Sequence, residues 1–128
     1  MNAITLEVPE LPDMRLSANG RRRLLPQEAA RLVREQNERW YWLLCEHRPW
    51  PPAPGLPWQR VRLTWELTYP SKRIPDNDDA GLKVVRDTLC VATKRTPGAW
   101  RLGLIPDDSP AHVVSTTLTQ RYERGVRQ

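Results

Sequence analysis

The chain has 128 residues and a mass of 14.9 kDa, which suffices for one hydrophobic core but not for two. Apolar residues make up 39% of it and six are tryptophan, so a disordered protein is excluded despite a mean hydropathy of -0.65. The net charge of +5 comes from 17 arginines and 3 lysines against 15 acidic residues. Because the arginine fork suits phosphate, nucleic acid is the leading partner class, although codons rich in G and C produce the same arginine excess.

Targeting signals and cysteine or histidine spacings typical of metal sites are not evident in the sequence. No run of 18 apolar residues occurs, and the N-terminus lacks the basic, apolar and small-residue order of a signal peptide, so we expect a soluble, cytoplasmic protein without a membrane partner. Cys45 and Cys90 lie in apolar segments and are expected to be reduced thiols. His47 and His112 are isolated, which predicts structural or surface roles.

The first half of the chain predicts a strand, a basic loop and a helix. Apolar and polar residues alternate over 4–8, which predicts a half-buried strand, and 13–25 is a basic loop. Apolar residues then recur at three- and four-residue steps from Pro26 to His47, which predicts an amphipathic helix. The three consecutive aromatic residues 40–42 are more than one apolar face of the helix needs, so we expect at least one ring to face a partner subunit or the sheet edge.

The second half predicts a connector, further strands and a second helix. Prolines make 48–58 a stiff connector, and strict alternation over 61–68 predicts a strand. A helix is expected to start near Asp78 or Asp79, either of which can cap it. An apolar segment at 100–105, a strand at 113–118 and a basic tail at 121–128 complete the chain. The order β-α-β-α-β(-β) predicts a single α+β domain over 1–128, with a small mixed sheet covered by two helices.

Two acidic clusters are the candidates for chemistry. The run 76–79 precedes the second helix, and Asp107-Asp108 precedes the last strand. Carboxylates on separate loops suit Mg²⁺, which can bind a phosphate and activate water for phosphodiester hydrolysis. Ordinary capping and turn chemistry explains the same residues. Lys83 lies one turn inside the helix, where it is either a surface lysine or a contact to the scissile phosphate.

These residues resemble a known family. The segment Arg73-Ile-Pro-Asp-Asn77, then Lys83, Asp87 and Leu89, then 104–113, is similar to the RusA endodeoxyribonucleases of phages and prophages. The stretch 15–21 also looks like the opening of that family, so the resemblance covers most of the chain, with specific motifs over 73–113. It implies a homodimeric, Mg²⁺-dependent Holliday junction resolvase that cuts four-way DNA junctions by paired nicks.

The resemblance also implies roles for individual residues. Asp76, Asp108 and Lys83 correspond to catalytic positions, and the metal would be held by Asp76 and Asp108, with Asp78, Asp79 and Asp107 as further candidates. Contacts to the DNA backbone are expected from seven residues: Arg15, Arg21, Arg22, Arg23, Lys72, Arg73 and Asn77.

The chain departs from the family at Ile74, where the motif usually has its first aspartate. Alternate residues of an extended segment share a face, so this face presents Ile74 and Asp76 in place of two carboxylates. Three interpretations follow: Asp78 or Asp79 replaces the ligand, the enzyme uses fewer carboxylates, or cleavage is lost while junction binding is kept. A slipped alignment would place Asn77 and Asp79 on the motif, but it breaks the Pro-Asp-Asn match.

Rival interpretations remain beside the resolvase. The run 76–87 echoes an EF-hand loop, but Ala80 stands where a ligand oxygen is required and Asp87 replaces the bidentate Glu. Two alternatives come from other functional classes. One is a catalytically impaired or inactive protein of the same fold that binds branched DNA or acts as a regulatory DNA-binding module. The other is a structural or interaction protein whose charge serves only solubility.

Overall fold

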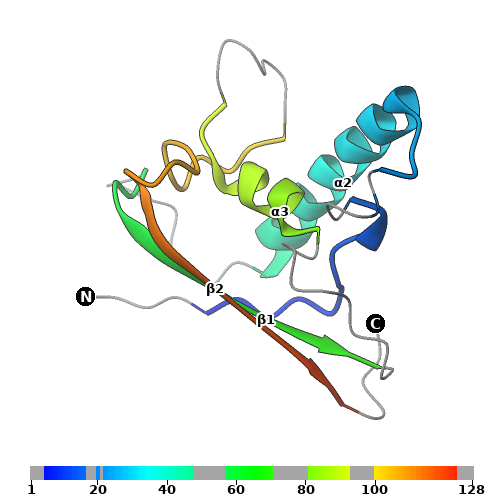
Figure 1. Ribbon diagram of the computed structural model, residues 1–128. Helices are drawn as coiled ribbons and strands as arrows, with labels where there is room; N and C mark the ends of the chain where they lie inside the picture. The colour runs from blue at the N-terminus through cyan, green and yellow to red at the C-terminus, as the bar shows by residue number, and fades with distance from the viewer. Residues whose placement is uncertain are drawn as a thin grey trace.

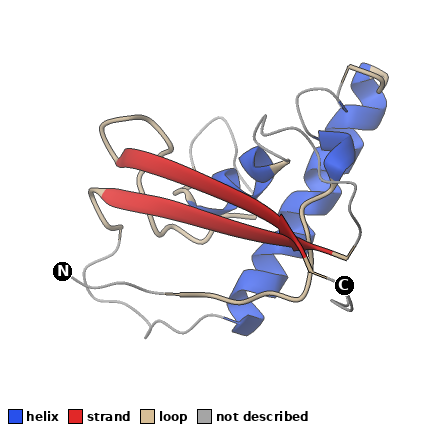
Figure 2. Cartoon of the chain, turned by 60° about the horizontal axis from the view of Figure 1, so that its bottom comes forward, coloured by secondary structure: helices blue, strands red, loops and turns tan. Residues whose placement is uncertain are grey.

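The computed structural model describes residues 5–16, 20, 22–47, 57–70, 81–92 and 100–123. The elements are, in order, η1 (Met14–Leu16), α2 (Pro26–His47), β1 (Val61–Tyr69), α3 (Leu82–Leu89) and β2 (Val113–Tyr122). Figures 1 and 2 show both helices on one side of the two strands. The predicted α+β class is therefore confirmed.

Helix α2 has the bounds that its apolar periodicity predicts. Pro26 opens it, and the Glu28 carboxylate accepts a hydrogen bond from the backbone N–H of Leu25, which satisfies one otherwise unpaired donor of the first turn. Its buried side chains are Leu32, Asn37, Trp40 and Leu44. The apolar stripe is thus confirmed, and Asn37 is an addition that apolar periodicity does not predict.

Strands β1 and β2 form a parallel pair that runs from Val61↔Val113 to Tyr69↔Tyr122, with an irregularity between Val61 and Arg62. A parallel pair needs a crossover connection, and α3 lies within it. The predicted strand at 61–68 is confirmed, and its alternate residues are the less exposed ones. The prediction of a mixed sheet is wrong for the described residues, which contain only this parallel pair.

The predicted strand 4–8 and the apolar segment 100–105, a possible further strand, are both irregular where the structure describes them. Within the predicted strand 4–8, the described residues Thr5 to Val8 make no ladder, although Leu6 and Val8 pack against the main core. The apolar segment 100–105 contributes only an isolated bridge between Cys90 and Ile105. Gly103 interrupts it with a φ of 70°, a conformation that a continuous strand does not contain. In these two segments the apolar residues predict which side chains are buried, but they do not predict whether the backbone pairs in a sheet.

The main core joins both helices to β1. Its buried members are Trp40, Leu44, Leu67, Tyr69, Leu82 and Val85. A second cluster unites Leu16, Leu32 and Val84, so α3 contributes to both clusters. Burial raises the pKa of Tyr69, whose hydroxyl donates to Gln120 Oε1 at 2.6 Å and so links the two strands.

The aromatic excess of α2 forms an outward cluster. The rings of Tyr41, Trp42 and Trp100 lie with centroids 5.2 to 5.7 Å apart, and Trp42 is 55% exposed. The outward ring that we expected is therefore Trp42, while its contact with a partner subunit stays a prediction.

Cys45 and Cys90 are both free thiols, as expected. In the described part of the chain, no helix has the length and apolar character that crossing a membrane requires.

Asn37 is the polar centre between the two helices. Its Oδ1 accepts hydrogen bonds from Thr88 Oγ1 at 3.3 Å and from Arg101 Nη1 at 3.2 Å. Thr88 is fully buried, and its one hydroxyl proton is shared between Asn37 Oδ1 and the nearer Val84 carbonyl at 2.9 Å. Since a buried donor needs an acceptor, Asn37 serves two segments that lie far from it in the sequence.

We predict that Asn37→Ala destabilises the fold by about 1–3 kcal/mol, because it removes the acceptor shared by Thr88 and Arg101. Urea denaturation would measure the free energy of unfolding. The matched control is Glu38→Ala, an exposed neighbour on the same helix, which should change it by less than about 0.5 kcal/mol. Equal losses in the two variants would contradict a special role for Asn37.

Candidate functional site

Helix α3 begins later than the sequence predicts. Its N-cap is Gly81, which has a φ of 78° and makes no side-chain cap hydrogen bond, so the expectation that Asp78 or Asp79 caps the helix is wrong. A Cβ at Gly81 would lie 2.7 Å from the Asp13 carbonyl oxygen, so glycine is required both for the left-handed backbone and for the close approach. The contact fixes the start of α3 against the N-terminal segment.

Lys83 lies between two carboxylates. Its Nζ is 3.5 Å from Asp87 Oδ1, one turn along α3, and 3.8 Å from Asp108 Oδ2, which lies in the loop before β2. The side chains of Lys83, Asp87 and Asp108 are 51%, 29% and 36% exposed, so the group is open to solvent on one side. The structure thus brings together Lys83 and Asp108, two residues predicted from the sequence, and adds Asp87 to them.

Backbone hydrogen bonds hold the loop of Asp108 against the end of α3. The N–H groups of Leu102 and Leu104 donate to the carbonyls of Thr88 and Leu89, both at 2.8 Å, and Val91 N–H donates to the Ile105 carbonyl at 3.0 Å. Ile105 is almost completely buried. The position of Asp108, three residues later, is therefore set by the core.

Asp107 and Asp108 have different surroundings. Asp107 Oδ1 accepts a hydrogen bond from the Ser109 N–H at 2.8 Å, and its carboxylate closes the turn before β2. Hydrogen bonds from the Ser109 hydroxyl and backbone lower the pKa of Asp107. His112, three residues after Ser109, is 2.7 Å from the Gln59 carbonyl through Nδ1, so it anchors the loop to the start of β1. Asp107 caps the turn while Asp108 faces Lys83.

Cys90 is the buried group beside this site. Its Sγ donates to the Arg86 carbonyl at 3.5 Å. Burial, and after it the negative charges of Asp108 and Asp87, raise the pKa of the thiol to about 11. The thiol is therefore protonated at neutral pH, and its pKa depends on the charges of both carboxylates.

The carboxylates of Asp87 and Asp108 are the kind of oxygen ligand that Mg²⁺ prefers, and both lie near one point, which the Lys83 ammonium occupies. In the described ranges, no three His, Cys, Asp or Glu side chains are grouped closely enough to hold a metal. The other predicted site residues, Lys72, Arg73, Asp76, Asn77, Asp78 and Asp79, lie outside the described residues, as does Ile74. Their roles stay predictions.

The predicted DNA-binding arginines differ in how they are paired. Arg15 donates from Nε and Nη2 to the Asp13 carboxylate, at 3.0 and 2.6 Å, and this lowers the pKa of Asp13. Arg22 and Arg23 are exposed, whereas Arg21 lies outside the described residues. Arg22 and Arg23 are thus better placed for phosphate than Arg15, which already has an anionic partner.

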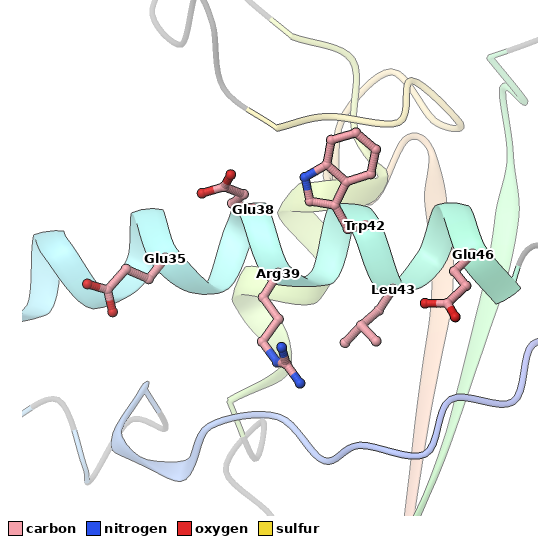
Figure 3. Close-up of a pocket in the computed structure, with 6 residues that line it drawn as sticks. All are labelled: Glu35, Glu38, Arg39, Trp42, Leu43 and Glu46. Carbon is pink, nitrogen blue, oxygen red and sulfur yellow. The ribbon is translucent and has the colours of Figure 1, made fainter.

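A shallow depression on α2 has the opposite character (Figure 3). It is lined by Glu35, Glu38, Arg39, Trp42, Leu43 and Glu46. Arg39 is paired with Glu10, so the depression has an excess of negative charge. It contains none of the predicted site residues, and its carboxylates would repel a phosphate backbone.

Comparison with known proteins gives no match: no family model, no curated protein and no solved structure is significantly similar to this chain. The site therefore has to be interpreted from its own residues.

The sequence analysis did not include Asp87 among the site residues, although a usable signal was present. Lys83 and Asp87 are four residues apart on a predicted helix, and such pairs lie on one face. The contact of Lys83 with Asp108 spans 25 positions and has no local signal.

We predict that iodoacetamide labels native Cys90 at pH 8 at least about 100-fold more slowly than it labels the urea-denatured chain. A pKa raised from 9.0 to about 11 lowers the thiolate fraction by roughly that factor, and burial slows access further. Mass spectrometry in a Cys45→Ser background would measure the rate.

Asp108→Asn in the same background should accelerate labelling, because one of the charges that raise the Cys90 pKa is removed. Glu46→Gln on α2 is the control and should leave the rate unchanged. An unchanged rate in Asp108→Asn would mean that Asp108 does not face the thiol.

Proposed function

We propose that this chain is a RusA-type, Mg²⁺-dependent endonuclease that resolves four-way DNA junctions. The observation that carries the proposal is the contact between Lys83 and Asp108, which lie on a helix and on a distant loop. The family resemblance in the sequence independently assigns Lys83 and Asp108 to one site. A homodimer, a cytoplasmic location and a phage or prophage origin belong to the same proposal.

Each residue of the site has a distinct part in this function. Asp108 and Asp76 would hold Mg²⁺, and Asp78, Asp79 and Asp107 remain candidates for further ligation. Lys83 would place a positive charge beside the scissile phosphate. Its exposed ammonium is open to a phosphate, while the buried stripe of α3 keeps the helix itself in place.

Bound Mg²⁺ would add positive charge at the phosphate and lower the pKa of an attacking water. The chain's own contribution is to direct carboxylate oxygens and one ammonium to the same point and to keep them on rigid supports. The backbone hydrogen bonds between the end of α3 and residues 102–105 provide that support.

The DNA is expected to contact the basic segment around Arg15, Arg21, Arg22 and Arg23, together with Lys72, Arg73 and Asn77. Contacts of this kind grip the phosphates and do not read sequence. The acidic depression of α2 excludes that face from the DNA path, because its carboxylates repel phosphate.

A second candidate is a protein that binds branched DNA without cutting it. Ile74 favours this alternative, since it removes a carboxylate where the family usually has one. Both candidates use the same surface, so one assay distinguishes them.

We predict metal-dependent, symmetric nicking of a labelled four-way junction, which EDTA abolishes and linear duplex does not undergo. Asp108→Asn should lower the rate by at least about 100-fold, because loss of a ligand should cost no less than loss of an outer partner. The matched control is Glu38→Gln, an exposed carboxylate in the depression on α2, which should retain full activity. Asp107→Asn keeps an oxygen acceptor for Ser109, and a loss of activity in it would assign Asp107 to the metal ligands.

Ile74→Asp should increase cleavage if the missing carboxylate limits metal binding. Tight junction binding with no product in either protein would favour the non-cleaving alternative. Equal affinity for branched and linear DNA would reject a junction-selective function.

We predict that replacing Arg22 and Arg23 together with alanine weakens junction binding and reduces the slope of log K against log[salt] by about 2, since each lost phosphate contact removes roughly one unit. Fluorescence anisotropy at several salt concentrations would measure it. Arg31→Ala removes an equally exposed arginine that is paired with Glu35 on α2, and its slope should match the wild type. An unchanged slope in the double variant would place the DNA elsewhere.

A further inference from the structure

Lys83 has two ionic partners, Asp87 and Asp108, and its sequence spacing predicts only the first of them. A lysine has a flexible four-carbon stem and samples many rotamers when it is exposed. Here its ammonium is held from two directions, at 3.5 Å by Asp87 and at 3.8 Å by Asp108. Two anionic contacts restrict the stem more than either one alone.

Asp87 is the better anchored of the two carboxylates. It is the least exposed of the three side chains, and it belongs to α3, whose Leu82, Val84 and Val85 are buried in the two clusters. Its reach to Lys83 is the standard four-residue geometry of a helix. Asp108 lies on a loop and is more exposed, so Asp87 is the contact that defines where the ammonium rests.

We propose that Asp87 is a positioning residue that holds the Lys83 ammonium beside Asp108. The inference rests on the proposed function only for its effect on cleavage; its effect on Lys83 is a property of the folded chain alone. An ordinary surface ion pair on a helix contributes little and leaves both groups free to move. The pair here differs because its ammonium also meets a carboxylate from a distant loop.

Asp87 also sets the net charge of the group formed by Lys83, Asp87 and Asp108. Two carboxylates and one ammonium leave the trio with a net charge of -1 at neutral pH, which attracts a divalent cation. Without the charge of Asp87, Lys83 neutralises Asp108, and that attraction is lost. Removing Asp87 should therefore raise the Mg²⁺ concentration that gives half-maximal cleavage.

The test is Asp87→Asn, with Asp87→Glu as the conservative rescue variant. The first readout needs no activity: NMR of the lysine ε-methylene groups gives an order parameter for each side chain, and the chain has only three lysines. The Lys83 signal is identified by its loss in Lys83→Arg. We expect Lys83 to become more mobile in Asp87→Asn and to regain order in Asp87→Glu, while backbone amide spectra show an intact fold.

The second readout is junction cleavage. We expect kcat to fall about tenfold in Asp87→Asn with unchanged affinity for the junction, a higher Mg²⁺ requirement, and partial recovery in Asp87→Glu. The matched control is Glu35→Gln, which breaks the equivalent four-residue pair with Arg31 on α2 and should alter neither readout.

Each result has one meaning. Unchanged Lys83 order in Asp87→Asn overturns the positioning role, whatever the activity. Lower order with unchanged cleavage overturns its catalytic consequence. A wild-type protein that cuts no junction contradicts the proposed function, and Asp87 is then judged by the order of Lys83 alone.

Discussion

The backbone pairing between the end of α3 and residues 102–105 is the constraint on which the site depends. Five backbone hydrogen bonds of 2.8 to 3.2 Å join residues 102–105 to residues 88–91 at this end of the helix. Leu104 and Ile105 are buried, so the pairing is shielded from water and cannot be exchanged cheaply for solvent contacts. Since α3 is itself fixed by both apolar clusters, the loop that carries Asp108 takes its position from the core. The Asp108 carboxylate and the Lys83 ammonium lie on separate segments, and the packing of the core is what brings them together.

The same logic applies at the other end of α3. Gly81 passes so close to the Asp13 carbonyl that no side chain fits between them, and Leu16 packs with Val84 a few residues further along both segments. The 3-10 helix η1, which contains Arg15, is therefore held against the helix that carries Lys83. In the proposed function this attachment matters, because the arginines that grip DNA and the lysine that meets the phosphate must keep a fixed relation. The buried Asn37, which receives hydrogen bonds from Thr88 and Arg101, adds a polar link between α2 and α3.

The parts of the fold that the sequence predicts are those with a long apolar period. Helix α2 matches its predicted bounds and β1 matches closely, because each buries one face along its length. Strand β2 begins at the predicted Val113 but continues to Tyr122, past the predicted strand 113–118 and into the predicted basic tail, and most of its residues are exposed. The segment 4–8 was predicted as a strand and 100–105 as a possible further strand, because apolar residues recur in both. The described residues 5–8 make no ladder, and the backbone of 102–105 pairs with the end of α3 instead. The start of α3 was missed since the left-handed Gly81, and not an aspartate, precedes it. At the site, the Lys83–Asp87 contact follows from helical spacing. The Lys83–Asp108 contact needs the tertiary fold, and only a family resemblance suggested it in advance.

The distribution of charge shows why an overall positive chain has a negative site. Several arginines are already neutralised by neighbouring carboxylates, as in the pairs Arg15–Asp13 and Arg39–Glu10. The trio of Lys83, Asp87 and Asp108 has one charge more on the acidic side, so a phosphodiester that approached it without a metal would be repelled. A divalent cation reverses that sign at the one point where the chain directs its oxygen atoms. Under the proposed function, DNA is therefore attracted by the basic segment at a distance, and only a metal-loaded site accepts the scissile phosphate. Under the same proposal, the carboxylates that repel a phosphate would be the groups that make cleavage depend on the metal.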